Sequence, residues 1–138
     1  MPLKLEIVTP EARIFSDEVD TVVLPGYDGE IGVLPAHAPL VTTLQYGELR
    51  YTKGGKTTEL AVGEGLVEIT GSTARVLTDM AVSHDEIDEK AVEEALERAK
   101  HSLESLKAGE KQDEVAAVMA IIQRSTAQLH LKRRRKSL

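Results

Sequence analysis

The apolar residues of this 138-residue chain change their spacing near residue 83. Up to Val82 they form short runs or alternate with polar residues, as in Leu3–Ile7, and turn residues interrupt them at close intervals. A spacing of two residues is typical of strands that bury one face. After Val82 the spacing becomes about 3.6 residues, the period of an amphipathic helix. We therefore expect a β part followed by an α part.

The first part, residues 1–84, is predicted to be an antiparallel β-sandwich or flattened barrel. Many short strands separated by glycines favour this architecture over parallel β-α-β units. The segment Thr52–Thr57 contains two adjacent glycines, which supply the positive φ angles of a tight hairpin turn. Since the chain has one Phe and no Trp, the core must be aliphatic.

The second part, residues 85–138, is predicted to be an antiparallel α-helical hairpin. Ser83–Glu86 matches a capping box that opens the first helix, and Asp85 is an alternative cap. Two apolar stripes follow, separated by a break at Ala108–Lys111. They consist of Ala91, Ala95, Leu96, Ala99, Leu103 and Leu106, and of Val115, Val118, Met119, Ile122 and Leu129. Stripes this thin bury little surface, so we expect a marginally stable hairpin that can reopen.

The stretch Val22–Leu40 is predicted to be a shaped, exposed loop between two strands. Its glycines and prolines interrupt regular structure several times. Asp28 and Glu30 place two carboxylates at the tip of this loop, with the apolar Ile31 beside them. A loop held this firmly indicates a contact surface. The residues alone leave open that the two acids are merely solvated turn residues.

The charge of the chain is unevenly distributed. The net charge is −6, and residues 1–84 hold six basic residues against twelve acidic ones, yet Lys132–Lys136 is uniformly basic. An acidic body with few aromatic residues argues against nucleic acid as a partner. The basic run fits a protein partner with an acidic face, although terminal charge runs are also often idle, solvated tails.

Motifs of catalysis and metal binding are incomplete. Gly55–Thr57 ends like a phosphate-binding loop, but Arg50 stands where that loop needs its first glycine. The four histidines are scattered, and the absence of cysteine excludes sulfur-ligated zinc and thiolate catalysis. We therefore expect no enzyme and no metal site. No apolar run of about 18 residues and no leader-like N-terminus is found, so neither a membrane span nor secretion is expected.

Several segments taken in order closely resemble the epsilon subunit of bacterial F-type ATP synthases, the counterpart of delta in mitochondria. The resemblance covers essentially the whole chain. It rests on Gly29–Gly32, Leu34–Leu40, Gly63–Glu68 and Ile87–Asp88. One departure is Ala36, where the family usually has glycine.

The resemblance implies a non-catalytic rotor subunit of a proton-translocating ATP synthase, peripheral at the cytoplasmic face of the cell membrane. In this family the β domain seats on the gamma subunit and on the membrane rotor ring of c subunits. The helical hairpin lies folded against the β domain or extends along gamma into the alpha/beta catalytic head, where it inhibits ATP hydrolysis.

The resemblance also implies roles for individual residues. The rotor-ring contact falls on Asp28, Gly29, Glu30, Ile31 and Gly32. His37 and Pro39 lie toward gamma. The acidic segment of the beta subunit is met by Arg133, Arg134 and Arg135, with Arg124 as a further candidate.

One branch of the family binds ATP between the helices through an Ile-Asp-x-x-Arg-Ala motif. Ile87 and Asp88 match its start, but Ala91 occupies the place of its arginine. Residues left for such a site are Asp88, Arg98 and Arg124. With fewer charge-assisted donors for a triphosphate, we expect no cofactor. Two alternatives stay open: a small ATP sensor, and an unrelated β-sandwich binding module whose helical hairpin docks a partner.

Overall fold

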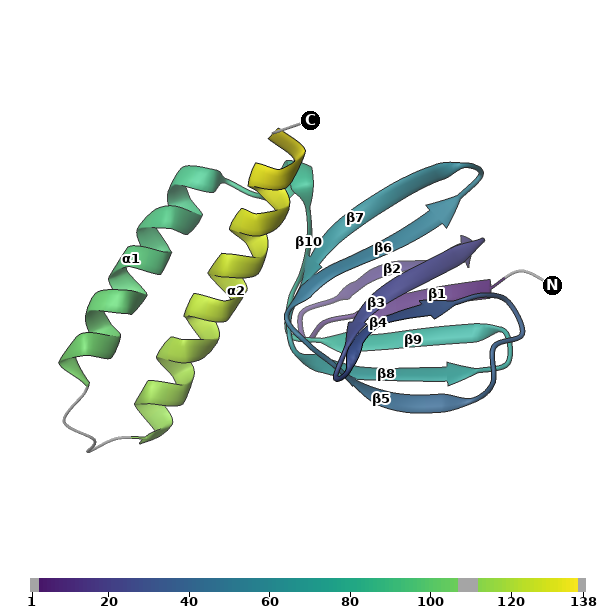
Figure 1. Cartoon of the computed structure of the whole chain (residues 1–138), viewed down its shortest axis with the longest axis horizontal. Helices are drawn as coiled ribbons and strands as arrows, with labels where there is room; N and C mark the ends of the chain where they lie inside the picture. The colour runs from purple at the N-terminus through teal and green to yellow at the C-terminus, as the bar shows by residue number, and fades with distance from the viewer. Residues whose placement is uncertain (1–2, 107–111, 137–138) are drawn as a thin grey trace.

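The computed structural model describes residues 3–106 and 112–136 (Figure 1). The strands are β1 (Leu3–Val8), β2 (Arg13–Val19), β3 (Thr21–Gly26), β4 (Gly29–Val33), β5 (Leu40–Leu44), β6 (Gly47–Lys53), β7 (Lys56–Val62), β8 (Gly65–Thr70), β9 (Thr73–Thr78) and β10 (Ala81–Ser83). A short 3-10 turn, η1 (His84–Glu86), leads into helices α1 (Glu89–Ser105) and α2 (Gln112–Lys136). The predicted fold class, a β-sandwich or barrel followed by an α-hairpin, is confirmed.

The ten strands of the described chain form one sheet in the order β10-β7-β6-β3-β5-β8-β9-β1-β2, with β4 paired to β3 outside this path. The sheet folds over on itself, and the hairpin lies beside one end of it, with α2 between α1 and the strands (Figure 1). One pairing departs from the antiparallel prediction: β1 runs parallel to β9, with Lys4–Val8 beside Thr73–Leu77. This pair joins the two ends of the β region, and local periodicity carries no information about such long-range pairing.

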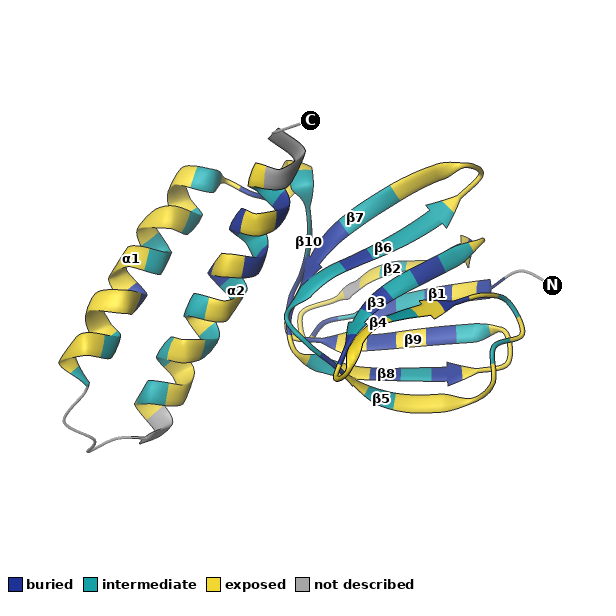
Figure 2. Ribbon diagram, in the orientation of Figure 1, coloured by how far each residue is buried: buried dark blue, intermediate teal, exposed yellow. Residues whose placement is uncertain are grey.

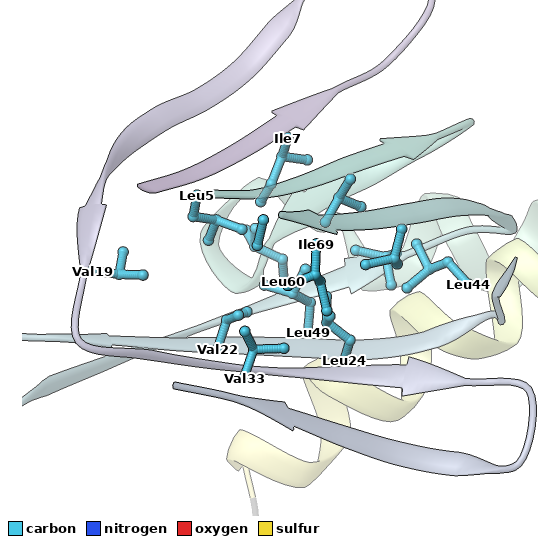
Figure 3. Packing of buried hydrophobic residues seen from close by; sticks show 14 of the residues in the cluster. Leu5, Ile7, Val19, Val22, Leu24, Val33, Leu44, Leu49, Leu60 and Ile69 are labelled. Atoms are coloured by element: carbon cyan, nitrogen blue, oxygen red, sulfur yellow. The ribbon is translucent and has the colours of Figure 1, made fainter. Parts of the chain in front are cut away.

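Alternating side chains build an aliphatic core between the two halves of the folded sheet. Leu3, Leu5 and Ile7 of β1 are fully buried, and the polar residues between them face outward. Leucine, isoleucine and valine side chains from strands of both halves meet in the same interior (Figure 3). Phe15 and Tyr51 pack at its edge with ring centroids 4.6 Å apart. Aliphatic packing of this kind confirms the prediction from composition.

Glycines at two places in the fold, the β6–β7 turn and the start of β8, explain motifs of the sequence. Gly54 and Gly55 have φ angles of 58° and 82° and close the β6–β7 hairpin, as predicted. At Gly65 a Cβ atom would lie 1.8 Å from the carbonyl oxygen of Leu77, so any side chain there collides with the backbone of β9. The glycine of the Gly63–Glu68 segment is thus required by close strand approach.

The prediction of an irregular loop over Val22–Leu40 is wrong for its first half. Strands β3 and β4 form an antiparallel hairpin in which Gly26 pairs with Gly29, leaving Tyr27 and Asp28 as a two-residue tip. Strand β4 bonds to β3 alone among the described strands, and its two glycines are tolerated at such an edge. Residues 34–39 are irregular, as expected.

The capping box forms but does not cap the α-helix. The backbone N–H of Ser83 donates to the Glu86 carboxylate at 2.9 Å, and this pair caps η1. Ile87 then adopts an extended conformation and is buried, which ends the turn. Helix α1 begins only at Glu89, and Asp88 is its N-cap, accepting from the Ala91 N–H at 3.1 Å.

The hairpin packs on the β part through a small set of residues, which we call the docking cluster. It consists of Ala61, Met80, Ile87, Ala127 and Leu131, with Val82 and Val92 at its margin. Leu131 is fully buried and is the largest side chain that α2 contributes to it.

The stripe predicted for α1 is only partly correct. Ala91 is exposed, Ala99 is buried, and the remaining members are half-buried (Figure 2). The break predicted at Ala108–Lys111 lies outside the described residues.

Candidate functional site

The predicted ring-contact residues lie on the β3–β4 hairpin rather than on a loop. Asp28 is exposed at the tip, and Gly29, Glu30, Ile31 and Gly32 follow in β4. The structure therefore brings all five together on one hairpin. A hairpin presents alternate residues to opposite faces, so neighbours such as Glu30 and Ile31 do not share a surface.

Glu30 is engaged within the chain. Its carboxylate accepts from the guanidinium of Arg50 on β6 at 2.9 Å, and the two side chains are 59% and 32% exposed. Arg50 pairs with Val23 of β3, two strands away from Glu30. The pair leaves Glu30 reachable but reduces the negative charge expected at this end of the molecule.

Ile31 faces inward more than predicted. Its side chain is half-buried against the main core, and its terminal atoms lie over Gly26. A large exposed side chain occurs instead at Tyr27, which is 74% exposed at the tip. The sequence analysis missed Tyr27. Its position between Gly26 and Asp28, at the turn of an alternating segment, is the signal that indicates it.

His37 and Pro39 lie in the connection from β4 to β5. His37 is half-buried, with Nδ1 2.6 Å from the carbonyl oxygen of Ala38, and Pro39 is exposed. Ala36 just before them has a φ of 65°, a left-handed conformation that favours glycine. A glycine at this position would adopt the same conformation without that strain.

A surface that the sequence analysis missed lies on the outer side of β1, β5, β8 and β9. It consists of Val8, Val41, Leu66 and Leu77, which we call the apolar outer face. Val41, Leu66 and Leu77 are 63%, 39% and 42% exposed.

Strand register makes the outer face continuous. Leu66 of β8 lies opposite Leu77 of β9, and Leu77 lies beside Val8 of β1. Thr43, two residues after Val41, pairs with Leu66. Leu66 and Leu77 stand at the outward positions of their alternating strands, a pattern visible in the sequence. A row of exposed apolar side chains across a sheet is typical of a protein-binding surface.

The predicted inhibitory arginines lie on α2, and Arg133 is engaged. Its Nε donates to Glu89 of α1 at 3.0 Å, and a second guanidinium N–H donates to Glu93. These two bonds raise the pKa of Arg133 above its ordinary value. Arg124 is half-buried on the same helix. The side chains of Arg134 and Arg135 lie outside the described part of the structure.

The residues suggested for ATP binding do not act together in the structure. Asp88 is occupied as the N-cap of α1, and Arg98 is exposed on the same helix. Burial is the main cause that raises the pKa of the Tyr46 hydroxyl. The positive charge of Arg124 lies close enough to oppose this rise. Among the described side chains, no ion pair or hydrogen bond joins Asp88, Arg98 and Arg124 to one another.

A cleft of about 610 Å³ separates α2 from β3, β4 and β6. Its polar lining includes Glu30 and Arg50 on the strand side and Gln123, Thr126 and His130 on the helix side. The helix thus lies against the same hairpin that carries the predicted ring contact.

Neither a metal centre nor a phosphate loop emerges from the described residues. No group of three or more potential metal ligands converges among them. Gly55–Thr57 belongs to the β6–β7 hairpin turn and the start of β7, and no helix follows it. None of the helices in the described ranges is long and apolar enough to cross a membrane.

Comparison with known proteins now decides the family. The model of the ATP synthase delta/epsilon chain beta-sandwich domain matches residues 2–84. The ATP synthase epsilon chain of Herpetosiphon aurantiacus is 36% identical, with 99% of this chain and 98% of the relative covered. The chain belongs to the ATP synthase delta/epsilon family. The predicted resemblance is confirmed, and an unrelated binding module is excluded.

Other family members agree. The ATP synthase epsilon chain of Carboxydothermus hydrogenoformans is 48% identical over 73% of this chain and 75% of the relative. A chain in the structure of the Euglena gracilis mitochondrial ATP synthase, OSCP/F1/c-ring, has a TM-score of 0.75 at 21% identity, covering 94% of this chain and 79% of that one. That structure supports the fold. Membership of the family confirms that the chain is a non-catalytic component of an ATP synthase.

Proposed function

We propose that this chain is the central-stalk rotor subunit that couples gamma to the membrane rotor ring and inhibits ATP hydrolysis through its hairpin. The observation that carries the proposal is the separation of two surfaces. The apolar outer face belongs to the rigid β part, while the hairpin is held by the small docking cluster at another place. One surface can stay bound while the other moves.

Gamma is the proposed occupant of the apolar outer face. The connection that carries His37 and Pro39 leads directly into β5, the strand of Val41, and we include these two residues in the proposed gamma contact. Leu66 and Leu77 are only about two-fifths exposed, so their complete burial by gamma contributes roughly 0.6–1.2 kcal/mol each.

The rotor ring is the proposed partner of the β3–β4 hairpin. Tyr27 supplies a large exposed aromatic surface at the tip, and Asp28 supplies a carboxylate. Aromatic anchors with polar neighbours are typical of interface hot spots. The ion pair between Glu30 and Arg50 presents both a carboxylate and a guanidinium, so it can bind ring loops of either charge.

The hairpin is the proposed regulatory element. Its contact with the β part depends chiefly on one large buried residue, Leu131, so the free energy that holds it folded is small. When it opens, α2 carries Arg124 and Arg133 toward the alpha/beta head. We propose no ATP site, since Asp88 serves as a helix cap and Ala91 cannot bind a phosphate.

Membrane association follows from these contacts alone. The rotor ring holds the chain at the cytoplasmic face of the cell membrane, and no part of the described chain enters the bilayer in this proposal.

Binding to immobilised gamma tests the proposal. The double variant Leu66→Gln/Leu77→Gln is expected to lose at least about ten-fold in affinity, because both side chains would leave water on binding. Ile121→Gln, an exposed apolar residue on α2, is the matched control and is expected to bind as the unmodified chain does. Equal binding by both variants would contradict the seat on the outer face.

A further inference from the structure

Arg133 joins the two helices at one end of the hairpin. It lies near the C-terminus of α2, and its two acceptors lie in the first two turns of α1. Glu89 and Glu93 are four residues apart, so they point from the same face of α1 and both reach one guanidinium. A planar guanidinium suits two carboxylates better than an ammonium group does.

Helix dipoles favour this arrangement. Glu89 lies in the first turn of α1, where a negative charge is stabilised, and Arg133 lies near the C-terminus of α2, where a positive charge is stabilised. The neighbouring Lys132 donates to the carbonyl oxygen of His84 at 3.1 Å, and Leu131 is buried in the docking cluster. Three consecutive residues of α2 therefore hold the same end of this helix, Leu131 and Lys132 against the docking cluster and η1, and Arg133 against α1.

The contacts of Arg133 also decide whether it is available to a partner. While both glutamates accept from it, its Nε and one Nη group donate inside the chain. A partner carboxylate that binds the guanidinium through these two groups competes with the glutamates. Since the side chain of Arg133 is 53% exposed, each ion pair is individually weak and is screened by salt. A weak ion pair changes the populations of the folded and the open hairpin appreciably only if these two states are close in free energy. The small docking cluster indicates that they are close.

We propose that Glu89 and Glu93 act as an internal substitute for an acidic partner, holding Arg133 and keeping α2 packed against α1, in its place beside the β part, until that partner competes for it. This inference rests on the proposed function for the identity of the partner, an acidic segment of the catalytic head. In this proposal Glu89 and Glu93 reduce inhibition by restraining α2, whereas the arginine that they bind promotes inhibition.

Opening of the hairpin in the isolated full-length chain tests the restraint directly. The sequence contains no cysteine, so Ser16→Cys and Ala116→Cys, both at exposed positions, give two specific dye sites for energy transfer. Glu89→Gln/Glu93→Gln is expected to raise the ratio of open to folded hairpin about two- to five-fold at low salt. High salt should reduce the difference between this variant and the unmodified chain.

The matched control is Glu94→Gln/Glu97→Gln. These two residues are exposed on α1, make no ion pair with another described side chain, and change the net charge equally. The control is expected to leave energy transfer unchanged. Equal opening by the two double variants would overturn the proposal. Circular dichroism of each variant verifies that α1 stays helical.

ATP hydrolysis by the reassembled complex tests the competition. Glu89→Gln/Glu93→Gln frees Arg133 and is expected to inhibit about two- to five-fold more strongly than the unmodified chain. Arg133→Gln also loosens the hairpin but removes the cation, so it should inhibit less than the glutamate variant. Equal inhibition by these two variants would overturn the competition. If the unmodified chain neither binds gamma nor inhibits hydrolysis, the proposed function fails, while the energy-transfer result still decides the restraint.

Discussion

At the scale of single residues, Ala36 bears a backbone cost. Its φ of 65° places an L-residue in the left-handed region, which costs roughly 1–2 kcal/mol, and glycine avoids this cost at an entropic penalty of about 0.5–1 kcal/mol. Ala36→Gly is therefore expected to raise the free energy of unfolding by about 0.5–1 kcal/mol. Denaturant titration measures this change. Ala38→Gly, at a position without positive φ, should lower stability, and a gain in both variants would contradict the argument.

Long-range residue pairs mark the limit of what the sequence predicts at this scale. The Gly54–Gly55 turn was predictable because two adjacent glycines specify it locally. The pair between Glu30 and Arg50 was not, since it depends on how β3 registers against β6, twenty residues along the chain. The same holds for Arg133 and its glutamates. Local sequence fixes what a turn needs, whereas register is decided by the packed core.

At the scale of secondary-structure elements, one ion pair spans strands that are not hydrogen-bonded neighbours. Asp17 of β2 binds Lys53 of β6, and β2 stands at the far end of the strand order from β6. Lys53 first, and then the Glu18 N–H, hold the pKa of Asp17 below its usual value of 3.8. The pair is exposed, so it is screened by salt.

The sign of the pH dependence follows from this lowered pKa. The ionised form of Asp17 stabilises the folded chain above the unfolded pKa, and the stabilisation is lost as pH falls through the folded pKa. Asp17→Asn should therefore be less stable than the unmodified chain near neutral pH and equally stable near about pH 2. Thermal unfolding across this range measures the difference. A stability difference that persists near about pH 2, or that Glu11→Gln also shows, would refute the Asp17–Lys53 pair as its cause.

Leu131 decides how firmly the two parts are joined. Because it is fully buried in the docking cluster, Leu131→Ala should weaken hairpin docking by about 2–4 kcal/mol, through lost burial and the cavity left behind. Native-state hydrogen exchange of α2 amides should speed up while the core strands stay protected. Ile121→Ala, on an exposed part of the same helix, is the control. Equal exchange in both variants would show that docking depends on other contacts.

Elements were more predictable than their boundaries and pairings. The change of period near residue 83 correctly separated strands from helices, because hydrophobic periodicity reflects local burial. The helix start was misplaced, since the capping box closes η1 and a buried Ile87 interrupts the chain before α1. The glycines and the one proline of β3 and β4 suggested a loop, because the tolerance of a strand for these residues depends on its place in the sheet, which the segment alone does not show.

At the scale of the whole molecule, the chain combines a rigid body with a loosely attached arm. The β part has a continuous aliphatic core and an apolar outer face, whereas α2 is held at one end by Leu131 and Lys132 against the docking cluster and η1, and by Arg133 against α1. The family supplies the setting, an ATP synthase. The outer face could have been recognised from Leu66 and Leu77 at outward strand positions. The contacts that hold the end of α2 could not, because the hydrogen bonds among them join residues forty or more positions apart.

Locking the hairpin in its folded position tests most directly whether the β part binds gamma while the hairpin alone inhibits hydrolysis. Ala61 of β7 and Ala127 of α2 both belong to the docking cluster, so cysteines at these two positions are the pair to be cross-linked under oxidising conditions. The oxidised chain, with the disulfide verified by mass, should bind gamma as tightly as the unmodified chain but leave ATP hydrolysis of the complex uninhibited. Reduction should restore inhibition. Undiminished inhibition by the locked chain would contradict the account.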